Sequence, residues 1–320
     1  MVKKIIILFT FFLITTSCTS SLYKNTFVIS GTYLTVISPY QEAAQIVFGE
    51  FKRLDKVFNY YSPDSEIAKL NNTFDKEVQV SSELIEVLQL SREIYNLSQG
   101  AFDISCGRLY EFWKSFMKGK KISEFPVAEQ IKALKDKSGM QYIEVNAQKN
   151  TVTIKKEGLK IDLSAIAKGY MVDKSAQKLI QAGIDSAIIN AGGDLYCLGR
   201  HRDKTWKSGI KDPSGLKEII ETVDLADEAI ATSGSYEQFF NFKGRRYSHL
   251  IDPRQGYPVE NDILSVSVVS KNCTTADSLA TAFFIMGLEG VKSFLSNNPS
   301  TLKIFVVTLQ DGKENIHIFK

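Results

Sequence analysis

Two stretches in the last third of the chain combine residue types that could do chemistry. The first, residues 248–256, reads Ser-His-Leu-Ile-Asp-Pro-Arg-Gln-Gly. Its Asp-Pro and Gln-Gly pairs predict a strand that ends in a turn. His249 would then stand at a strand end and face the cleft that the turn borders. A histidine there can act as a base near neutral pH, although a single histidine at a strand end is more often structural.

The second stretch, residues 274–281, predicts the start of a helix. Threonines suited to N-capping come first, and apolar residues follow at helical spacing. Asp277 and Thr281 are four residues apart and therefore share one helix face. Their oxygens are ligands for a hard cation such as Mg²⁺, and the helix N-terminus beside them favours phosphate oxygens. In the alternative reading, Asp277 only complements the helix dipole and Thr281 bonds back to the helix backbone.

A third stretch lies in the middle of the chain, at residues 160–170. The pattern predicts a strand that reaches Asp162, a turn of small residues, and a helix to about Ala182 that Gly183 stops. Such turns bring backbone groups close to a ligand, and Lys168 could reach back towards it as a point charge. The alternative is an ordinary surface lysine. The nearby Gly192-Gly193 pair fits a hairpin turn, not a nucleotide-binding loop.

The overall composition is that of a soluble globular protein. The chain has 320 residues and a formal net charge of +3, which is too mild to favour nucleic acid as a partner. Besides Cys18, the chain has three widely spaced cysteines, Cys106, Cys197 and Cys273, which fit neither a disulfide scaffold nor a zinc site. Strands occur in runs and helices are grouped, so we predict an α+β fold with antiparallel-rich sheets and packed helices.

The N-terminus has the features of an export signal. Two lysines precede an apolar run from Ile5 to Ile14, and Thr15-Thr16-Ser17-Cys18 follows. The run is too short to span a bilayer permanently. A cysteine directly after small residues resembles a bacterial lipobox, although Thr15 stands where leucine is usual, so ordinary secretion is the alternative. We predict a lipoprotein signal peptide at 1–17, lipidation of Cys18, a tether at 18–26 and one catalytic domain at 27–320, with a helical subdomain at about 75–137.

Seven different short motifs follow one another between Ser30 and Gly287. They are Tyr61 with Asp64-Ser65-Glu66-Ile67, Gly100-Ala101-Phe102-Asp103, Asp162 to Gly169, Asn190-Ala191-Gly192-Gly193, Ala231-Thr232-Ser233-Gly234, His249 to Arg254, and Thr275-Ala276-Asp277. Each motif is weak by itself. Together, their order and spacing resemble the FAD:protein FMN transferases, the ApbE family of flavin-attaching lipoproteins.

The resemblance implies a fold, an activity and a location. The fold would be ApbE-like and T-fold-like. The enzyme would cleave the pyrophosphate of FAD with Mg²⁺, release AMP and attach FMN through a phosphoester to a Thr or Ser of an exported acceptor protein. That acceptor would typically be a subunit of a membrane redox complex. The enzyme itself would be lipid-anchored to the inner membrane and would face the periplasm or the exterior.

The resemblance also assigns residues to roles. The Mg²⁺ ligands would be the backbone carbonyl of Ala165 and the side chains of Asp277 and Thr281. His249 matches the histidine that acts on the acceptor hydroxyl, and Lys168 would lie near the nucleotide and help to neutralise the breaking P–O bond. The other flavin and nucleotide contacts would be Ser30, which replaces a common methionine, and Tyr61, Ala101, Phe102, Asp103, Asp162 and Ile251.

Two other functions fit the same sequence. One is a Mg²⁺-dependent FAD pyrophosphatase, in which water replaces the acceptor hydroxyl and the products are FMN and AMP. The other is an exported flavin-binding lipoprotein without turnover, for which His249 and Asp277 would be dispensable. The remaining histidines are weaker candidates for a base, because His201 lies in a charged loop and His317 in a terminal hairpin.

Overall fold

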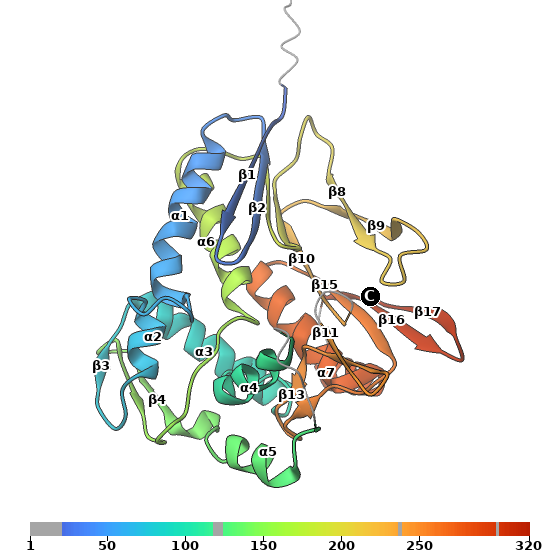
Figure 1. The fold of residues 1–320 in the computed structure, drawn as a ribbon. Helices are drawn as coiled ribbons and strands as arrows, with labels where there is room; N and C mark the ends of the chain where they lie inside the picture. Colours follow the sequence, from blue (N-terminus) through green and yellow to red (C-terminus); the bar gives the residue numbers. More distant parts are fainter. Residues whose placement is uncertain (1–20, 118–123, 236–238, 299–300) are drawn as a thin grey trace, which may run out of the picture.

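The central element of the computed structural model is an antiparallel sheet of eight strands (Figure 1). The structure describes residues 21–117, 124–235, 239–298 and 301–320, so the predicted signal peptide and Cys18 lie outside the described residues. In spatial order the strands are β1 (Tyr23–Ile29), β2 (Thr32–Ser38), β6 (Ala187–Ala191), β7 (Asp194–Leu198), β10 (Glu228–Gly234), β15 (Ile263–Ser270), β16 (Lys303–Gln310) and β17 (Lys313–Phe319).

The folded part of the chain begins earlier than the sequence predicted. The predicted tether runs to Thr26, but β1 starts at Tyr23, since residues 23–26 already pair with residues 35–38 of β2. The α+β class is confirmed, and so is the hairpin turn at Gly192-Gly193, which joins β6 to β7.

Three long helices cover one face of this sheet. They are α1 (Ala43–Phe58), α6 (Ala167–Gln181) and α7 (Cys273–Asn297). Side chains that alternate along the strands, such as Leu34 and Val36 of β2, are buried against them. Among the described residues, α7 alone has the length and apolar character to cross a membrane, but 56% of its apolar stretch is buried, as in a core helix.

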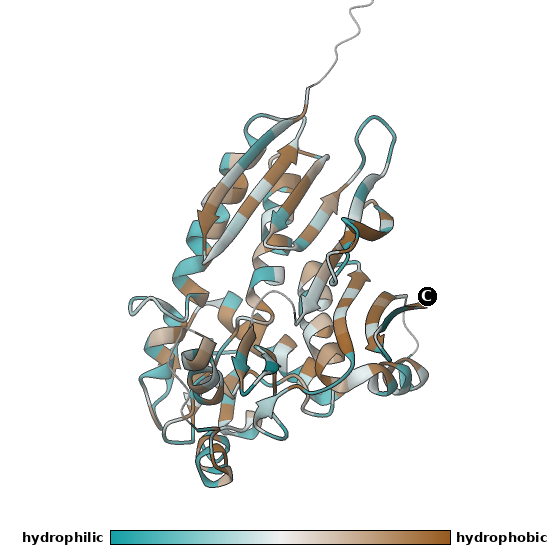
Figure 2. Ribbon diagram, turned by 45° about the vertical axis from the view of Figure 1, so that its right-hand side comes forward, coloured by the Kyte–Doolittle hydropathy of each residue, from teal (hydrophilic) through white to brown (hydrophobic). Residues whose placement is uncertain are grey.

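The opposite face of the sheet carries a hairpin of β8 (Trp206–Lys211) and β9 (Ile219–Leu225). Trp206 and Leu225 are buried there against Leu195 and Phe305 of the sheet. Figure 2 shows apolar positions along the strands of the sheet and polar ones in the connecting loops. The central strands are therefore buried on both faces, by the helices on one side and by the hairpin on the other.

A second group of elements packs below the helices. It comprises α2 (Glu66–Asn71), α3 (Ser82–Leu97), the 3₁₀ turn Met140–Tyr142 and a small sheet of β3 (Val78–Gln79), β4 (Ile143–Asn146) and β5 (Thr151–Ile154). Leu84 and Leu88 of α3 belong to the same apolar core as the sheet. The predicted helical subdomain at 75–137 is therefore divided, because α3 belongs to the main core.

The remaining helices form a separate aromatic cluster. Here α4 (Gly107–Met117) and α5 (Ala128–Lys135) pack with β11 (Phe239–Phe242), β12 (Arg245–Ser248), β13 (Ile251–Asp252) and β14 (Tyr257–Pro258). Trp113 is fully buried at its centre, stacks on Phe240 and donates its indole N–H to the Gly256 carbonyl at 2.9 Å. This contact fixes the turn that follows His249.

The N-terminus of α7 differs from its prediction. The helix begins at Cys273, and Asn272, not a threonine, caps it by accepting the Thr275 N–H at 2.8 Å. Asp173 of α6 accepts the N–H groups of Cys273 and Thr274 at 2.7 and 2.8 Å. The predicted phosphate site at this helix end is therefore wrong, since a carboxylate of the protein already takes these donors.

We predict that Asp173→Ala lowers the free energy of unfolding by about 2 kcal/mol or more, because two N–H groups lose their acceptor. Urea denaturation would measure the change. The control is Glu289→Ala, which removes an exposed ion pair with Lys292 and should cost less than about 1 kcal/mol. Equal effects of the two substitutions would contradict this account of the cap.

Candidate active site

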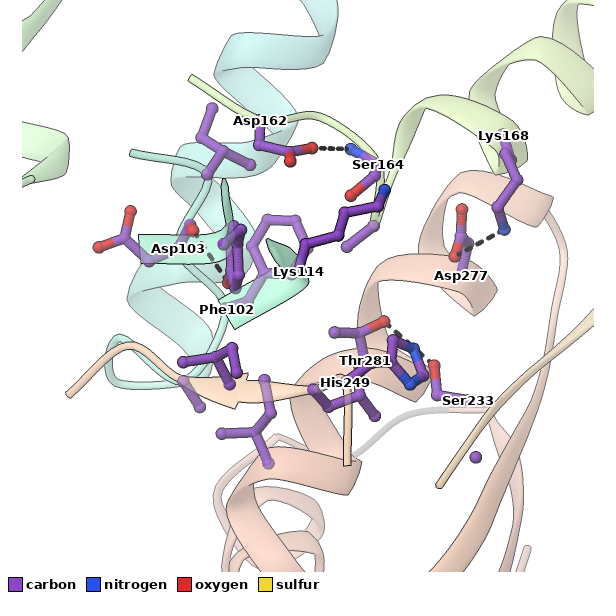
Figure 3. Close-up of a pocket in the computed structure, with 18 of the residues that line it drawn as sticks. Phe102, Asp103, Lys114, Asp162, Ser164, Lys168, Ser233, His249, Asp277 and Thr281 are labelled. Carbon is purple, nitrogen blue, oxygen red and sulfur yellow. Dashed lines mark hydrogen bonds and ion pairs between the residues drawn. The ribbon is translucent and has the colours of Figure 1, made fainter. Parts of the chain in front are cut away.

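A cavity of about 250 Å³ opens where the N-terminal part of α6, the middle of α7 and the end of β10 meet (Figure 3). The segments 101–104 and 249–251 form its other walls. The predicted site residues that line it are Ala101, Phe102, Asp103, Asp162, Ala165, Lys168, His249, Ile251, Asp277 and Thr281. The fold thus brings together residues that are up to 180 positions apart in the chain.

Ser30 and Tyr61 lie outside the wall of this cavity. Ser30 is in the β1–β2 turn with φ of 51°, and its hydroxyl donates to Asp55 Oδ1 at 2.7 Å. Tyr61 is 62% exposed, and its hydroxyl accepts from Lys114 Nζ at 2.5 Å. Because Lys114 lines the cavity, Tyr61 is one contact away from it, whereas Ser30 is not joined to it by any such contact within the described residues.

The crossing of α6 and α7 positions the acidic side of the cavity. A Cβ at Gly169 would collide with the backbone of Cys273 and lie 2.9 Å from the Asp277 Cβ, so only glycine permits this approach. The close approach also lets the Gly169 N–H donate to Asp277 Oδ2 at 3.1 Å. The carboxylate of α7 is thereby held against the first turn of α6.

Buried charges dominate this part of the site. Lys168 Nζ makes an ion pair with Asp194 Oδ2 and lies 3.9 Å from Asp277 Oδ1. Burial and the charge of Asp194 raise the pKa of Asp277 to about 7, although Lys168 opposes the shift. Burial also raises the pKa of Asp194, again against Lys168. Burial alone would lower the pKa of Lys168, but the two carboxylates outweigh it and raise this pKa.

The oxygen atoms around Asp277 suit a hard cation. Gly169 donates to Asp277, and no hydrogen bond in the described part of the chain ends on the Ala165 carbonyl, which therefore keeps its acceptor capacity. Thr281 Oγ1 lies 3.1 Å from Ser233 Oγ. When both carboxylates are ionised, they leave one excess negative charge beside the single ammonium, which a divalent cation would offset.

The candidate cation ligands are of different chemical types. Within the ranges that the structure describes, no group of three or more His, Cys, Asp or Glu side chains could hold a metal ion. The predicted set instead draws on one carboxylate, one hydroxyl and one carbonyl. Magnesium keeps several waters and shares substrate phosphates, so such a small protein set is sufficient.

His249 lines the cavity from the segment between β12 and β13. The strand predicted before the Asp-Pro turn is interrupted at this point, since β12 ends at Ser248 and β13 starts at Ile251. The Ser248 hydroxyl accepts the Leu250 N–H at 3.1 Å and stabilises this break. In Figure 3, His249 projects towards the side of the cavity where Thr281 and Ser233 lie.

Two further carboxylates line the wall nearest α4. Asp103 Oδ1 accepts the Ser105 N–H at 2.7 Å, and Asp162 Oδ1 accepts the Ser164 N–H at 2.8 Å. Burial raises the pKa of Asp103, although its hydrogen bonds with Ser105 oppose the shift. Both side chains therefore also shape the loops that carry them.

No role was predicted from the sequence for two residues that matter here. Asp194 contacts Lys168, and Lys114 lines the cavity. Asp194 directly follows the Gly192-Gly193 turn, and that position could have marked it. Lys114 lies on an amphipathic helix, and nothing in the sequence distinguishes it from an ordinary surface lysine.

We predict that the metal-free protein loses stability as the pH rises from about 4 to about 7. Folded Asp277 keeps its proton up to about pH 7, whereas an ordinary aspartate loses it near 3.8. The folded state then binds more protons than the unfolded state, so the free energy of unfolding falls with rising pH. Urea denaturation in EDTA at several pH values should show a smaller fall for Asp277→Asn. A parallel fall in both proteins would contradict the assignment.

Comparisons with known proteins identify the family of this chain. A family model described as the ApbE family matches residues 15–306. A Vibrio cholerae protein named FAD:protein FMN transferase is 34% identical over 257 residues, which cover 79% of this chain and 76% of the relative. A Treponema pallidum protein of the same name is 31% identical over 280 residues, covering 82% and 76%.

Solved structures show the same fold. The flavin transferase ApbE from Vibrio cholerae superposes with a TM-score of 0.83 at 27% identity and covers 93% of this chain and 97% of that one. The ApbE protein of Thermotoga maritima gives a TM-score of 0.82 at 29% identity, covering 92% and 96%. The chain therefore belongs to the ApbE family.

Proposed function

We propose that this enzyme transfers FMN from FAD, through a phosphoester bond, to a Thr or Ser hydroxyl of an exported acceptor protein, and that it requires Mg²⁺ and releases AMP. Its relatives are named FAD:protein FMN transferases, which supports the transferase class. The observation that carries the proposal is one cavity that combines cation-binding oxygens, a lysine and a histidine. Each of these groups has a task in transfer of a phosphoryl group.

The Mg²⁺ ion would be held by the Ala165 carbonyl, Asp277 and Thr281. The open acceptor capacity of the carbonyl and the excess negative charge beside Asp277 support this choice. A bound Mg²⁺ would neutralise the charge that develops on the diphosphate. Lys168 supplies a second positive charge in the same cavity and would orient the diphosphate oxygens.

His249 would act on the acceptor hydroxyl. It takes the hydroxyl proton as the oxygen attacks the phosphorus on the FMN side of the diphosphate. A new P–O bond forms to the acceptor, the bridging P–O bond breaks, and its electron pair leaves with AMP. The wall formed by Ala101, Phe102, Asp103, Asp162 and Ile251 would bind the flavin nucleotide. Tyr61 would act from the rim through its contact with Lys114, and we assign Ser30 no direct contact.

We also propose that the enzyme works outside the cytoplasm. The export signal supports this, and Cys18 would carry lipid that anchors the protein to the inner membrane. The acceptor would then be an exported protein domain, such as a subunit of a membrane redox complex.

The test incubates the purified protein with FAD, Mg²⁺ and a candidate acceptor, and reads the acceptor mass by mass spectrometry. We expect a gain of one FMN. His249→Ala should lower the transfer rate by about 10²-fold or more, as expected when a general base is lost. Asp277→Ala or EDTA should stop transfer, while FAD binding weakens only in part. His201→Ala is the matched control, because this histidine stacks on Trp206 outside the cavity.

The outcomes separate the three functions. Release of AMP without a gain in acceptor mass would establish the pyrophosphatase instead. FAD binding without either product would leave only a flavin-binding protein. Full activity in EDTA would contradict the role of Mg²⁺.

The anchor has a separate test. In cell fractionation we expect the wild-type protein in the membrane fraction, and Cys18→Ser in the soluble exported fraction, since the acylation site is lost. Cys197→Ser is the control, because this thiol is buried in the domain. A Cys18→Ser protein that stays in the membrane fraction would contradict lipidation at this residue.

A further inference from the structure

Asp194 is buried beside the cavity but does not line it. Its side chain is 4% exposed, whereas Lys168 is 33% exposed and reaches into the cavity. Among the hydrogen bonds of the described residues, Lys168 Nζ is the one donor to the Asp194 carboxylate. Asp194 therefore has Lys168 as its partner and has no direct access to a substrate.

The β6–β7 hairpin fixes the position of Asp194. Ala191 and Asp194 face each other across the Gly192-Gly193 turn, and the Asn190 side chain accepts the Gly193 N–H at 2.9 Å. Asp194 is thus held by the sheet, whereas Asp277 is held by α7. Lys168, on the first turn of α6, lies between carboxylates from two independent elements.

The two carboxylates compete for one ammonium group. Lys168 contacts Asp194 directly and remains 3.9 Å from Asp277 Oδ1. If Asp194 lost its charge, the nearest carboxylate for Lys168 would be Asp277. A closer ion pair there would occupy the oxygen that a cation needs, because a metal and an ammonium cannot share the same lone pairs.

We propose that Asp194 is a positioning residue that holds the Lys168 ammonium away from Asp277 and so keeps Asp277 free for the cation. The inference rests on the proposed function, since it assumes a cation at Asp277. It explains why a buried carboxylate with no access to the cavity faces the lysine of the site. It also keeps Lys168 oriented to meet the diphosphate.

The test measures cation binding directly, without turnover. Mn²⁺ serves as the probe, because it takes the same oxygen ligands as Mg²⁺ and its free form gives an EPR signal. The purified full-length protein is titrated with Mn²⁺ as wild type, Asp194→Asn, Lys168→Gln and the double variant. We expect Asp194→Asn to weaken Mn²⁺ binding by about tenfold, a coupling usual for neighbouring charges.

The double variant distinguishes positioning from a structural role. Without Lys168 nothing competes for Asp277, so the double variant should bind Mn²⁺ at least as tightly as wild type. Lys168→Gln alone should also bind at least as tightly, and this variant decides the matter if Asp194→Asn does not fold. Thermal unfolding of each variant checks that the fold is retained.

Three results would overturn the inference. Asp194→Asn could bind Mn²⁺ as wild type does, the double variant could stay as weak as Asp194→Asn, or Lys168→Gln could weaken binding. In each case the wild type still binds Mn²⁺, so the proposed cation site survives. A wild-type protein that binds no Mn²⁺ with or without FAD would instead overturn the cation site and this inference together.

Discussion

The close crossing of α6 and α7 is the constraint on which the site depends. Gly169 gives α6 no side chain at the contact, and its N–H donates to Asp277 at 3.1 Å. The Gly169 N–H is thereby used by the carboxylate, and within the described part of the chain no backbone N–H donates to the Ala165 carbonyl. One contact between helices thus fixes the Asp277 carboxylate in the cavity that Ala165 also lines.

The site also contains buried charges that do not balance. Asp194, Asp277 and Lys168 come from the sheet, from α7 and from α6, and one ammonium faces two carboxylates. Such an arrangement is costly in a folded protein unless a further positive charge is supplied. A bound cation would supply that charge, and functional sites commonly carry this kind of strain.

Much of the fold and site could be predicted from the sequence. Asp277 and Thr281 share a helix face by spacing alone, and the resemblance placed Ala165, Lys168 and His249 in one cavity. The features that the sequence did not predict depend on contacts between residues far apart in the chain. Asp173 takes the donors of α7 from another helix, and Asp194 meets Lys168 only after the sheet forms. The predicted tether is too long because pairing with β2, not local composition, orders residues 23–26.

The most direct test of the account is a crystal structure of the protein with FAD and Mn²⁺, in which anomalous scattering locates the metal. We predict one peak within coordination distance of the Asp277 carboxylate, the Thr281 hydroxyl and the Ala165 carbonyl, in contact with the diphosphate. A metal bound to the diphosphate but remote from Asp277 would contradict it.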